Sequence, residues 1–461
     1  MVVDRQISDG GVTLYFQGFA ALRASAGITG GFLRLVSDLN VRRCLIPSVL
    51  ALLIAFAAGV IYANPSSEHW VTTWATAQPL YPDVVPQGMK PPPKAAQGSP
   101  ISEYPPALSD STVRMIVRVS TGGHRVRIEL ANRQGESPVH IAASHIAQTA
   151  EAAAIVANSD RVLTFGGRQE VTIPPGATVT SDAVDLVVHP AEKLTVSLFL
   201  PGNVPTATVH TLGLHTTYVV AGNASAAQNP RVESQNRSYF WLSAIDVLAP
   251  GAATVAAFGD SITDGYATTP DKDQAWPTLL HSRLQAAPGT AGVGVVNLGI
   301  SGNRVLHDGA GANAMARFDR DVLALEGIKW VVMLEGINDI SYSAIPGFPA
   351  SERVSAQDLI AGYRMLIAKA HMHGLRMIGA TILPYQGVWT YTEGGEAVRE
   401  RVNEWIRTGG EFDATVDFDK ATRDPVNPKK LRMEFDSGDH VHPNDSGNHA
   451  MANTFNLATF Q

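Results

Sequence analysis

Short apolar stretches alternate with longer amphipathic ones throughout the second half of the chain, and this alternation restricts the fold most. Strands are predicted at five places: Thr254–Phe258, Gly294–Asn297, Trp330–Leu334, Met377–Ile382 and Thr415–Phe418. Helical segments are predicted at Ala275–Gln285, Ala312–Leu325, Ala356–His373, Glu396–Arg407 and Ser446–Leu457. Strands and helices that alternate at this length predict a parallel sheet with helices on both faces. The predicted class is therefore α/β.

Polar clusters follow these strands directly. The first strand leads into Asp260-Ser261, the second into 297–304 and the third into 335–339, while a fourth cluster at 436–444 follows the last strand. Parallel strands present their carboxyl ends at one edge of a sheet, where α/β folds place their ligands. The four loops are therefore predicted to converge on one site.

The residues in these loops suit ester hydrolysis, which needs a nucleophile, a base, a group that orients the base and donors for an oxyanion. Ser261 is the candidate nucleophile and His442 the candidate base. Asp439 can hold the imidazole tautomer of His442. The candidate oxyanion donors are the N–H groups of Ser261 and Gly302 and the side-chain amide of Asn338.

The order of these motifs resembles that of the SGNH hydrolases, also called GDSL esterases and lipases. The chain shows Gly-Asp-Ser, then a glycine, then Gly-x-Asn-Asp, then Asp-x-x-His, spread over 255–451. The resemblance assigns Ser261, Gly302, Asn338 and His442 to the four named blocks and makes Asp439 the triad acid. Ile262, next to the serine, stands where many members have leucine.

The same resemblance implies a fold and an activity. The fold would be a flavodoxin-like α/β/α domain with a five-stranded parallel sheet, and the activity ester hydrolysis without a metal or an organic cofactor. From Trp70 onward the chain looks like the secreted subgroup that carries a β-domain before the hydrolase domain.

In the region 66–248, apolar residues recur at every second position instead. Alternating apolar residues at 113–119 and 126–130 flank Gly122-Gly123 and predict a hairpin. Short strands at this spacing predict a β-sandwich or jelly roll, and the proline-rich stretch 82–106 is expected to be a long loop. Trp70 and Trp74 are interpreted as packing residues, with stacking on sugars as the alternative.

The N-terminal segment indicates export. Arg42-Arg43 precede an uncharged apolar run from Cys44 to Tyr62, and small and polar residues follow at 63–66. This pattern is typical of a cleaved secretory signal at about 42–63, with an uncleaved membrane anchor as the alternative. The mature protein is expected to be secreted or periplasmic, with no stable membrane insertion.

Composition argues against certain partners and certain kinds of site. The 461 residues carry a net charge of −7 and no long basic run, which argues against nucleic acid as the main partner. The single cysteine, Cys44, lies in the predicted signal, so the folded protein has no disulfide and no thiolate zinc site. We expect three parts: an extension with the signal at 1–63, a β-sandwich accessory domain at 66–248 and the hydrolase domain at 249–461.

The predicted protein is thus an exported serine esterase whose partner is a small-molecule or glycan ester. The substrates considered are O-acetyl groups on carbohydrate and short-chain or aryl esters. Two alternatives are a lysophospholipase or lipase and a non-catalytic carbohydrate-binding protein. A third is a metal-dependent hydrolase that uses His440 and His442. Four residues could line the pocket but are expected to belong to a structural salt-bridge network instead: Arg304, Asp308, Arg317 and Asp321.

Overall fold

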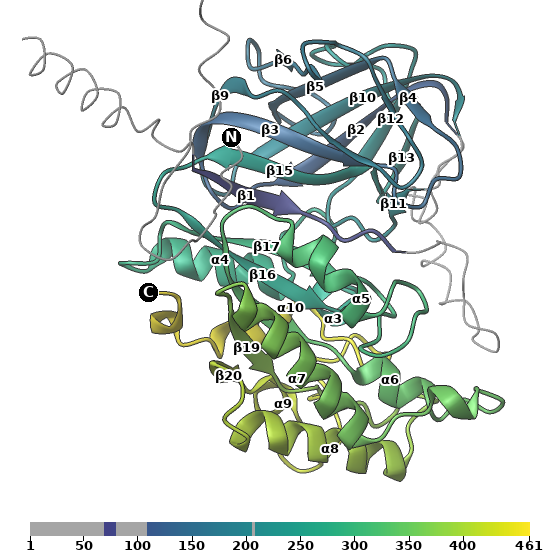
Figure 1. Ribbon diagram of the computed structural model, residues 1–461, viewed down its shortest axis with the longest axis vertical. Coiled ribbons are helices and arrows are strands. Elements are labelled where there is room, and N and C mark those ends of the chain that lie inside the picture. Colours follow the sequence, from purple (N-terminus) through teal and green to yellow (C-terminus); the bar gives the residue numbers. More distant parts are fainter. Residues whose placement is uncertain (1–68, 80–107, 205–207) are drawn as a thin grey trace, which may run out of the picture. The chain divides into compact units, whose positions relative to one another are not determined.

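A five-stranded parallel sheet forms the centre of the C-terminal region in the computed structural model, which describes residues 69–79, 108–204 and 208–461 (Figure 1). The strand order is β17-β16-β18-β19-β20, and every neighbouring pair is parallel. The strands are β16 (Ala253–Gly259), β17 (Val293–Gly299), β18 (Ile328–Leu334), β19 (Arg376–Ala380) and β20 (Ala414–Val416). The predicted parallel sheet is confirmed.

Helices cover both faces of this sheet, which is why its strands are almost continuously apolar. The connection from β16 to β17 runs one way along the sheet and the later connections run the other way. Right-handed crossovers therefore place the first helix opposite the later ones. The first is α4 (Trp276–Ala286), against which α10 (Asp445–Asn453) packs. The later ones are α5 (Ala314–Phe318), α7 (Ala356–Met372) and α8 (Glu393–Thr408).

Several short helices depart from the predicted pattern. Three were not predicted: α3 (Ser261–Asp264), α6 (Ile337–Tyr342) and α9 (Phe418–Thr422). The helix predicted at 312–325 is α5 followed by a single π-helical segment, Asp319–Leu323. Among the described residues, no helix combines the length and apolarity needed to cross a membrane.

Antiparallel sheets make up the preceding region. One contains β1 (Trp70–Ala75), β15 (Leu242–Leu248), β3 (Gly123–Ala131), β8 (Thr178–Thr180) and β9 (Val184–Val188). The other contains β13 (Ser234–Asn236), β12 (Thr217–Ala221), β2 (Leu108–Arg118), β10 (Lys193–Val204), β5 (Ala143–Gln148) and β6 (Arg161–Val162). Two small pairs join β11 (Val209–His210) to β14 (Tyr239–Phe240), and β4 (Val139–Ile141) to β7 (Val171–Ile173). Buried residues of the two large sheets form one hydrophobic cluster.

The hairpin predicted around Gly122-Gly123 is wrong. β2 pairs with β10 and β12, whereas β3 pairs with β15, β8 and β9. The two glycines therefore connect different sheets. A Cβ on Gly122 would lie 2.6 Å from the carbonyl oxygen of Val188, so the connection passes tightly against the end of β9. Alternation set which face of each strand is buried, but it did not identify the strand's partner.

The two tryptophans of β1 are packing residues in this structure. Trp70 is 9% exposed and lies under the guanidinium of Arg127, 4.5 Å from its ring centre. Trp74 meets Tyr239 edge to face at 5.0 Å. Both rings make the packing contacts that the sequence predicts, and Trp74 is half-buried. The predicted signal at 42–63 and the loop at 82–106 fall outside the described residues, and the domain boundary at 248/249 stays a prediction.

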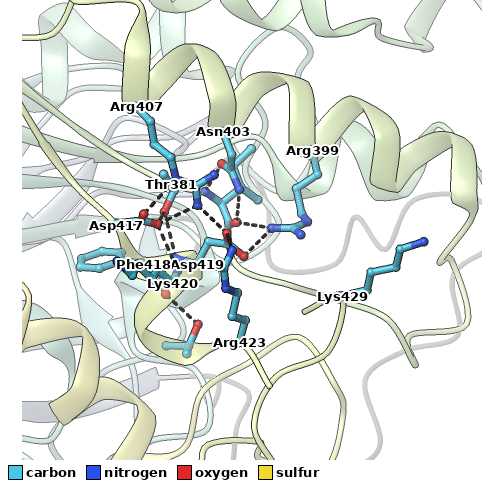
Figure 2. A network of polar contacts seen from close by, with 12 residues as sticks. Thr381, Arg399, Asn403, Arg407, Asp417, Phe418, Asp419, Lys420, Arg423 and Lys429 are labelled. Atoms are coloured by element: carbon cyan, nitrogen blue, oxygen red, sulfur yellow. Dashed lines mark hydrogen bonds and ion pairs between the residues drawn. The ribbon is translucent and has the colours of Figure 1, made fainter. Parts of the chain in front are cut away.

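A network of charged side chains fixes the loop after β19 (Figure 2). Asp419 of α9 accepts hydrogen bonds from Arg399 at 2.9 Å and Arg423 at 3.2 Å, and also from Arg407. The amide of Asn403 bonds both the N–H and the carbonyl of Ile382. α8 and α9 are thereby joined to the carboxyl edge of the sheet.

Candidate active site

Ser261 stands at the start of α3, directly after β16. The carboxylate of Asp260 caps this helix by accepting the N–H of Ile262 at 3.0 Å. α3 lies against β17 so closely that a Cβ on Gly299 would be 2.2 Å from the backbone nitrogen of Asp264. Ser261 is 6% exposed. The strand, the cap and this close approach fix the serine at the carboxyl edge of the sheet, beside the point where the strand order reverses.

His442 reaches Ser261 from the loop before α10. Its Nε2 lies 2.8 Å from Oγ of Ser261, and its Nδ1 lies 2.6 Å from Oδ2 of Asp439. The other oxygen of Asp439 accepts the N–H groups of Val441 and His442. Partial burial opposes ionisation of Asp439, but His442 and these N–H groups hold the pKa of its carboxyl well below the usual range. Tyr266 packs on the imidazole of His442, with ring centres 4.3 Å apart.

Gly302 and Asn338 follow the two strands that flank β16, which are β17 and β18. Gly302 has φ +78°, a left-handed conformation that favours glycine. Asn338 lies in the first turn of α6, and its side-chain amide donates to the carbonyl of Asn303 at 2.9 Å. Within the described residues, the N–H groups of Ser261 and Gly302 have no protein acceptor. Both are available to a ligand.

Asp339 holds the loop after β17 in place, a role that the sequence did not reveal. Its carboxylate accepts the N–H groups of Val305 at 2.8 Å and Leu306 at 3.2 Å. Burial raises the pKa of Asp339 to about 6, although these hydrogen bonds oppose the shift. In the sequence, an Asn-Asp pair could not be distinguished from a turn or a helix cap.

Arg317 lies fully buried beneath the strand ends. Its guanidinium donates to the carbonyls of Gly259 at 2.9 Å and Leu298 at 2.8 Å, and to Oδ1 of Asn303 at 2.7 Å. It also faces Asp321 at 3.3 Å and Glu335 at 3.6 Å. The structure thus places Arg317 and Asp321 in a buried salt-bridge network that joins the ends of β16 and β17.

A second histidine–aspartate pair lies beside the first. Nδ1 of His440 is 2.6 Å from Oδ2 of Asp436, and His440 has the unusual φ of +71°. His440 and His442 therefore each bond their own carboxylate. Across residues 69–79, 108–204 and 208–461, no group of three or more His, Cys, Asp or Glu side chains could hold a metal ion.

The structure brings Ser261, His442, Asp439, Gly302 and Asn338 to one edge of the sheet. This arrangement pairs a hydroxyl with an oriented imidazole and places backbone and side-chain donors around them. Chemically, it can activate an alcohol for attack on a carbonyl and stabilise the negative charge that develops.

Residues 255–455 match the family model described as GDSL-like Lipase/Acylhydrolase. The predicted family is confirmed over this part of the chain. No curated protein matches the sequence significantly.

Solved structures resemble only part of the chain. One is a variant of Axe2, an acetyl xylan esterase from Geobacillus stearothermophilus, with 24% identity, 44% of this chain and 92% of that chain covered and a TM-score of 0.36. Another is LAE5, an alpha/beta hydrolase enzyme from the metagenome of Lake Arreo, with 22% identity, coverages of 46% and 98% and a TM-score of 0.36. A third is a GDSL-like lipase from Bacteroides thetaiotaomicron, with 19% identity, coverages of 44% and 84% and a TM-score of 0.31.

Proposed function

Because residues 255–455 form a GDSL-like lipase/acylhydrolase domain, which is an ester hydrolase, we propose that Ser261, His442 and Asp439 are its catalytic triad. The observation that carries the proposal is the continuous contact from Oγ of Ser261 to Nε2 of His442 at 2.8 Å, and from Nδ1 of His442 to Asp439 at 2.6 Å. Asp439 is acceptor-only when ionised, so it fixes the proton on Nδ1 and leaves Nε2 free to accept the proton of the serine.

In the acylation step, Oγ of Ser261 forms a bond to the ester carbonyl carbon while Nε2 of His442 takes the hydroxyl proton. The N–H groups of Ser261 and Gly302 and the amide of Asn338 surround the resulting oxyanion. His442 then protonates the leaving alcohol as the carbon–oxygen bond breaks. The acyl group remains on Ser261.

In the deacylation step, water takes the place of the alcohol. His442 removes a proton from this water, whose oxygen attacks the acyl carbon under the same oxyanion donors. The bond to Oγ of Ser261 breaks, and His442 returns a proton to the serine. Asp439 stays ionised throughout and stabilises the imidazolium each time it forms.

For the substrate we propose O-acetyl groups on carbohydrate, or other short-chain and aryl esters. Trp389 supports the carbohydrate choice, because it is 64% exposed and lies on the loop after β19 at the same edge of the sheet. That loop also contacts the proposed catalytic loop: a Cβ on Gly387 would lie 2.7 Å from Cγ of His440. An exposed indole offers a flat apolar face on which a sugar ring can stack.

We also propose that the chain is exported, on the strength of its apolar run at 44–62 after two arginines. N-terminal sequencing of the protein recovered from culture medium or periplasm tests this. A mature N-terminus near residue 64 is expected. An intact N-terminus in the cytosolic fraction would contradict export.

The triad is tested by turnover of p-nitrophenyl acetate with Ser261→Ala and His442→Ala. Both variants should lose turnover by about 10³-fold or more. Ser282→Ala is the matched control, because Ser282 is an exposed serine of α4 whose hydroxyl donates to the carbonyl of Thr278 in the same helix. Retained turnover in Ser261→Ala would overturn the proposal. Acetate, butyrate and longer esters assayed in parallel separate a short-chain esterase from a lipase.

A further inference from the structure

A segment of the antiparallel region lies directly behind α3. His210 belongs to the two-residue strand β11, and residues 211–216 continue from it along the loop that follows α3. A Cβ on Gly265 would lie 2.8 Å from Cδ2 of Leu214, and the N–H of Asp271 donates to the carbonyl of Leu214 at 2.9 Å. The antiparallel region therefore contacts the helix that carries Ser261.

His210 contacts hydrogen-bond acceptors with both ring nitrogens. Nδ1 lies 2.7 Å from the carbonyl of Ala77, while Nε2 lies 2.9 Å from Oδ1 of Asp264 and 3.2 Å from the carbonyl of Leu212. A neutral imidazole has a single N–H, so beside an ionised Asp264 only the imidazolium can donate from both nitrogens. Both side chains are about 5% exposed or less. His210 and Asp264 thus form a buried ion pair between the two regions.

Asp264 extends this contact to the proposed oxyanion loop. Its second oxygen accepts the backbone N–H of Ser301 at 3.0 Å and the hydroxyl of Ser301 at 2.8 Å. Gly302, whose N–H is a proposed oxyanion donor, is the next residue. Because Asp264 also belongs to α3 with Ser261, one carboxylate fixes the distance between the two backbone donors of the proposed oxyanion hole.

We propose that His210 is a positioning residue for ester hydrolysis, supplied by the antiparallel region: it holds Asp264, and Asp264 holds Ser301 beside Gly302. The inference rests on the proposed function of Ser261 and Gly302. A buried carboxylate without its cationic partner is costly, so it takes up a proton or turns towards water. Either change weakens its bonds to Ser301. The raised pKa of His210, which Asp264 causes in spite of burial, agrees with the ion pair.

The kinetic consequence is specific. Oxyanion donors act on charge that develops in the transition state, so displacing one lowers kcat more than it raises KM. A displacement of about 1 Å at a reacting centre can cost about 10²-fold in rate. Loss of His210 should therefore lower kcat by about 10- to 100-fold while KM changes by less than about threefold. A merely structural link between the regions would change thermal stability and leave kcat intact.

The test compares His210→Gln with Thr254→Val in the full chain. The hydroxyl of Thr254 donates to the carbonyl of Thr72 at 2.9 Å, so Thr254→Val also removes a buried bond between the regions, but at the amino end of β16. Both variants should melt at a lower temperature. Only His210→Gln should lose kcat on p-nitrophenyl acetate, measured well below its melting temperature. Equal kcat in the two variants would overturn the inference.

A double-mutant cycle shows whether His210 acts through Asp264. If it does, His210→Gln combined with Asp264→Asn loses no more kcat than Asp264→Asn alone, whereas additive losses contradict the inference. If the His210 variants fail to fold, ¹⁵N NMR of the unchanged protein still tests the ion pair. His210 should carry protons on both nitrogens at pH 7, and a neutral ring would overturn the inference. Full turnover in Ser261→Ala would instead refute the proposed function.

Discussion

Oδ2 of Asp339 accepts the backbone N–H of Val305 at 2.8 Å, so a buried carboxyl on α6, which follows β18, fixes the loop after β17. Burial raises the pKa of Asp339 to about 6. Between the usual pKa of aspartate and about 6, the folded state therefore binds more protons than the unfolded chain. The contribution of Asp339 to the free energy of unfolding must therefore fall as pH rises through this window.

Asp339→Asn should remove this part of the pH dependence. We expect the free energy of unfolding of the unchanged protein to fall from pH 4 to pH 7 by on the order of 1–3 kcal/mol more than that of the variant. Urea unfolding at a series of pH values measures both slopes. Parallel pH profiles would contradict the raised pKa.

Asp439→Asn should lower kcat by about 10²- to 10⁴-fold, because an amide no longer fixes the proton on Nδ1 of His442 or stabilises the imidazolium. Asp436→Asn is a matched control, since Asp436 holds His440 at the same 2.6 Å in the same loop. Steady-state kinetics on p-nitrophenyl acetate should show kcat of Asp436→Asn within a few-fold of the unchanged protein. Similar losses in both variants would count against Asp439 as the triad acid.

Gly302→Ala should lower kcat by about 10- to 100-fold. Its φ of +78° disfavours a side chain, and a Cβ there would lie 3.0 Å from Cβ of Ala310 and 3.2 Å from the hydroxyl of Tyr342. Gly374→Ala is the control, because φ is +72° there and nothing lies within 4 Å of the added Cβ. Both variants should lose some stability, but only Gly302→Ala should lose kcat. A kcat loss shared by both would point to general strain.

The fold was predictable where the signal is local. Each of the five parallel strands overlaps its predicted range, because a strand covered on both faces requires a continuous apolar run. The hairpin at Gly122-Gly123 failed because the partners of β2 and β3 come from distant parts of the chain. The alternation of apolar and polar residues specifies which face of a strand is buried, but several choices of neighbouring strand satisfy it equally well.

In the candidate site, too, residues that follow strands could be predicted from the sequence, whereas an isolated buried contact could not. Ser261, Gly302 and Asn338 could be assigned to one candidate site because each comes soon after a strand, and topology brings the ends of parallel strands to one edge. His210 was not found. It lies in a two-residue strand, 54 residues before Asp264, and neither residue has a distinctive spacing. A buried contact between single polar residues leaves no periodic signal in the sequence.

Asp419→Ala should destabilise the protein by about 3–5 kcal/mol, because it leaves the buried guanidinium of Arg399 without one of its carboxylate partners (Figure 2). Glu411→Ala is the comparison, since Glu411 pairs with Arg364 at 2.6 Å on the surface. Removing that exposed pair should cost far less, because water and salt screen it. Urea unfolding measures both. Equal costs would show that burial does not decide the strength of these ion pairs.

Trp389→Ala should separate carbohydrate esters from simple ones. If the indole binds the sugar, kcat/KM on acetylated oligosaccharides should fall by about 10-fold, which corresponds to the loss of about 1.4 kcal/mol of binding free energy. Turnover of p-nitrophenyl acetate should stay unchanged, because the catalytic residues are untouched. Met372→Ala is the control: Met372 is also an exposed apolar residue, 83% exposed, but it ends α7 at the amino edge of the sheet. Equal losses on both substrates would place Trp389 in the catalytic machinery, and no loss on either would remove it from substrate binding.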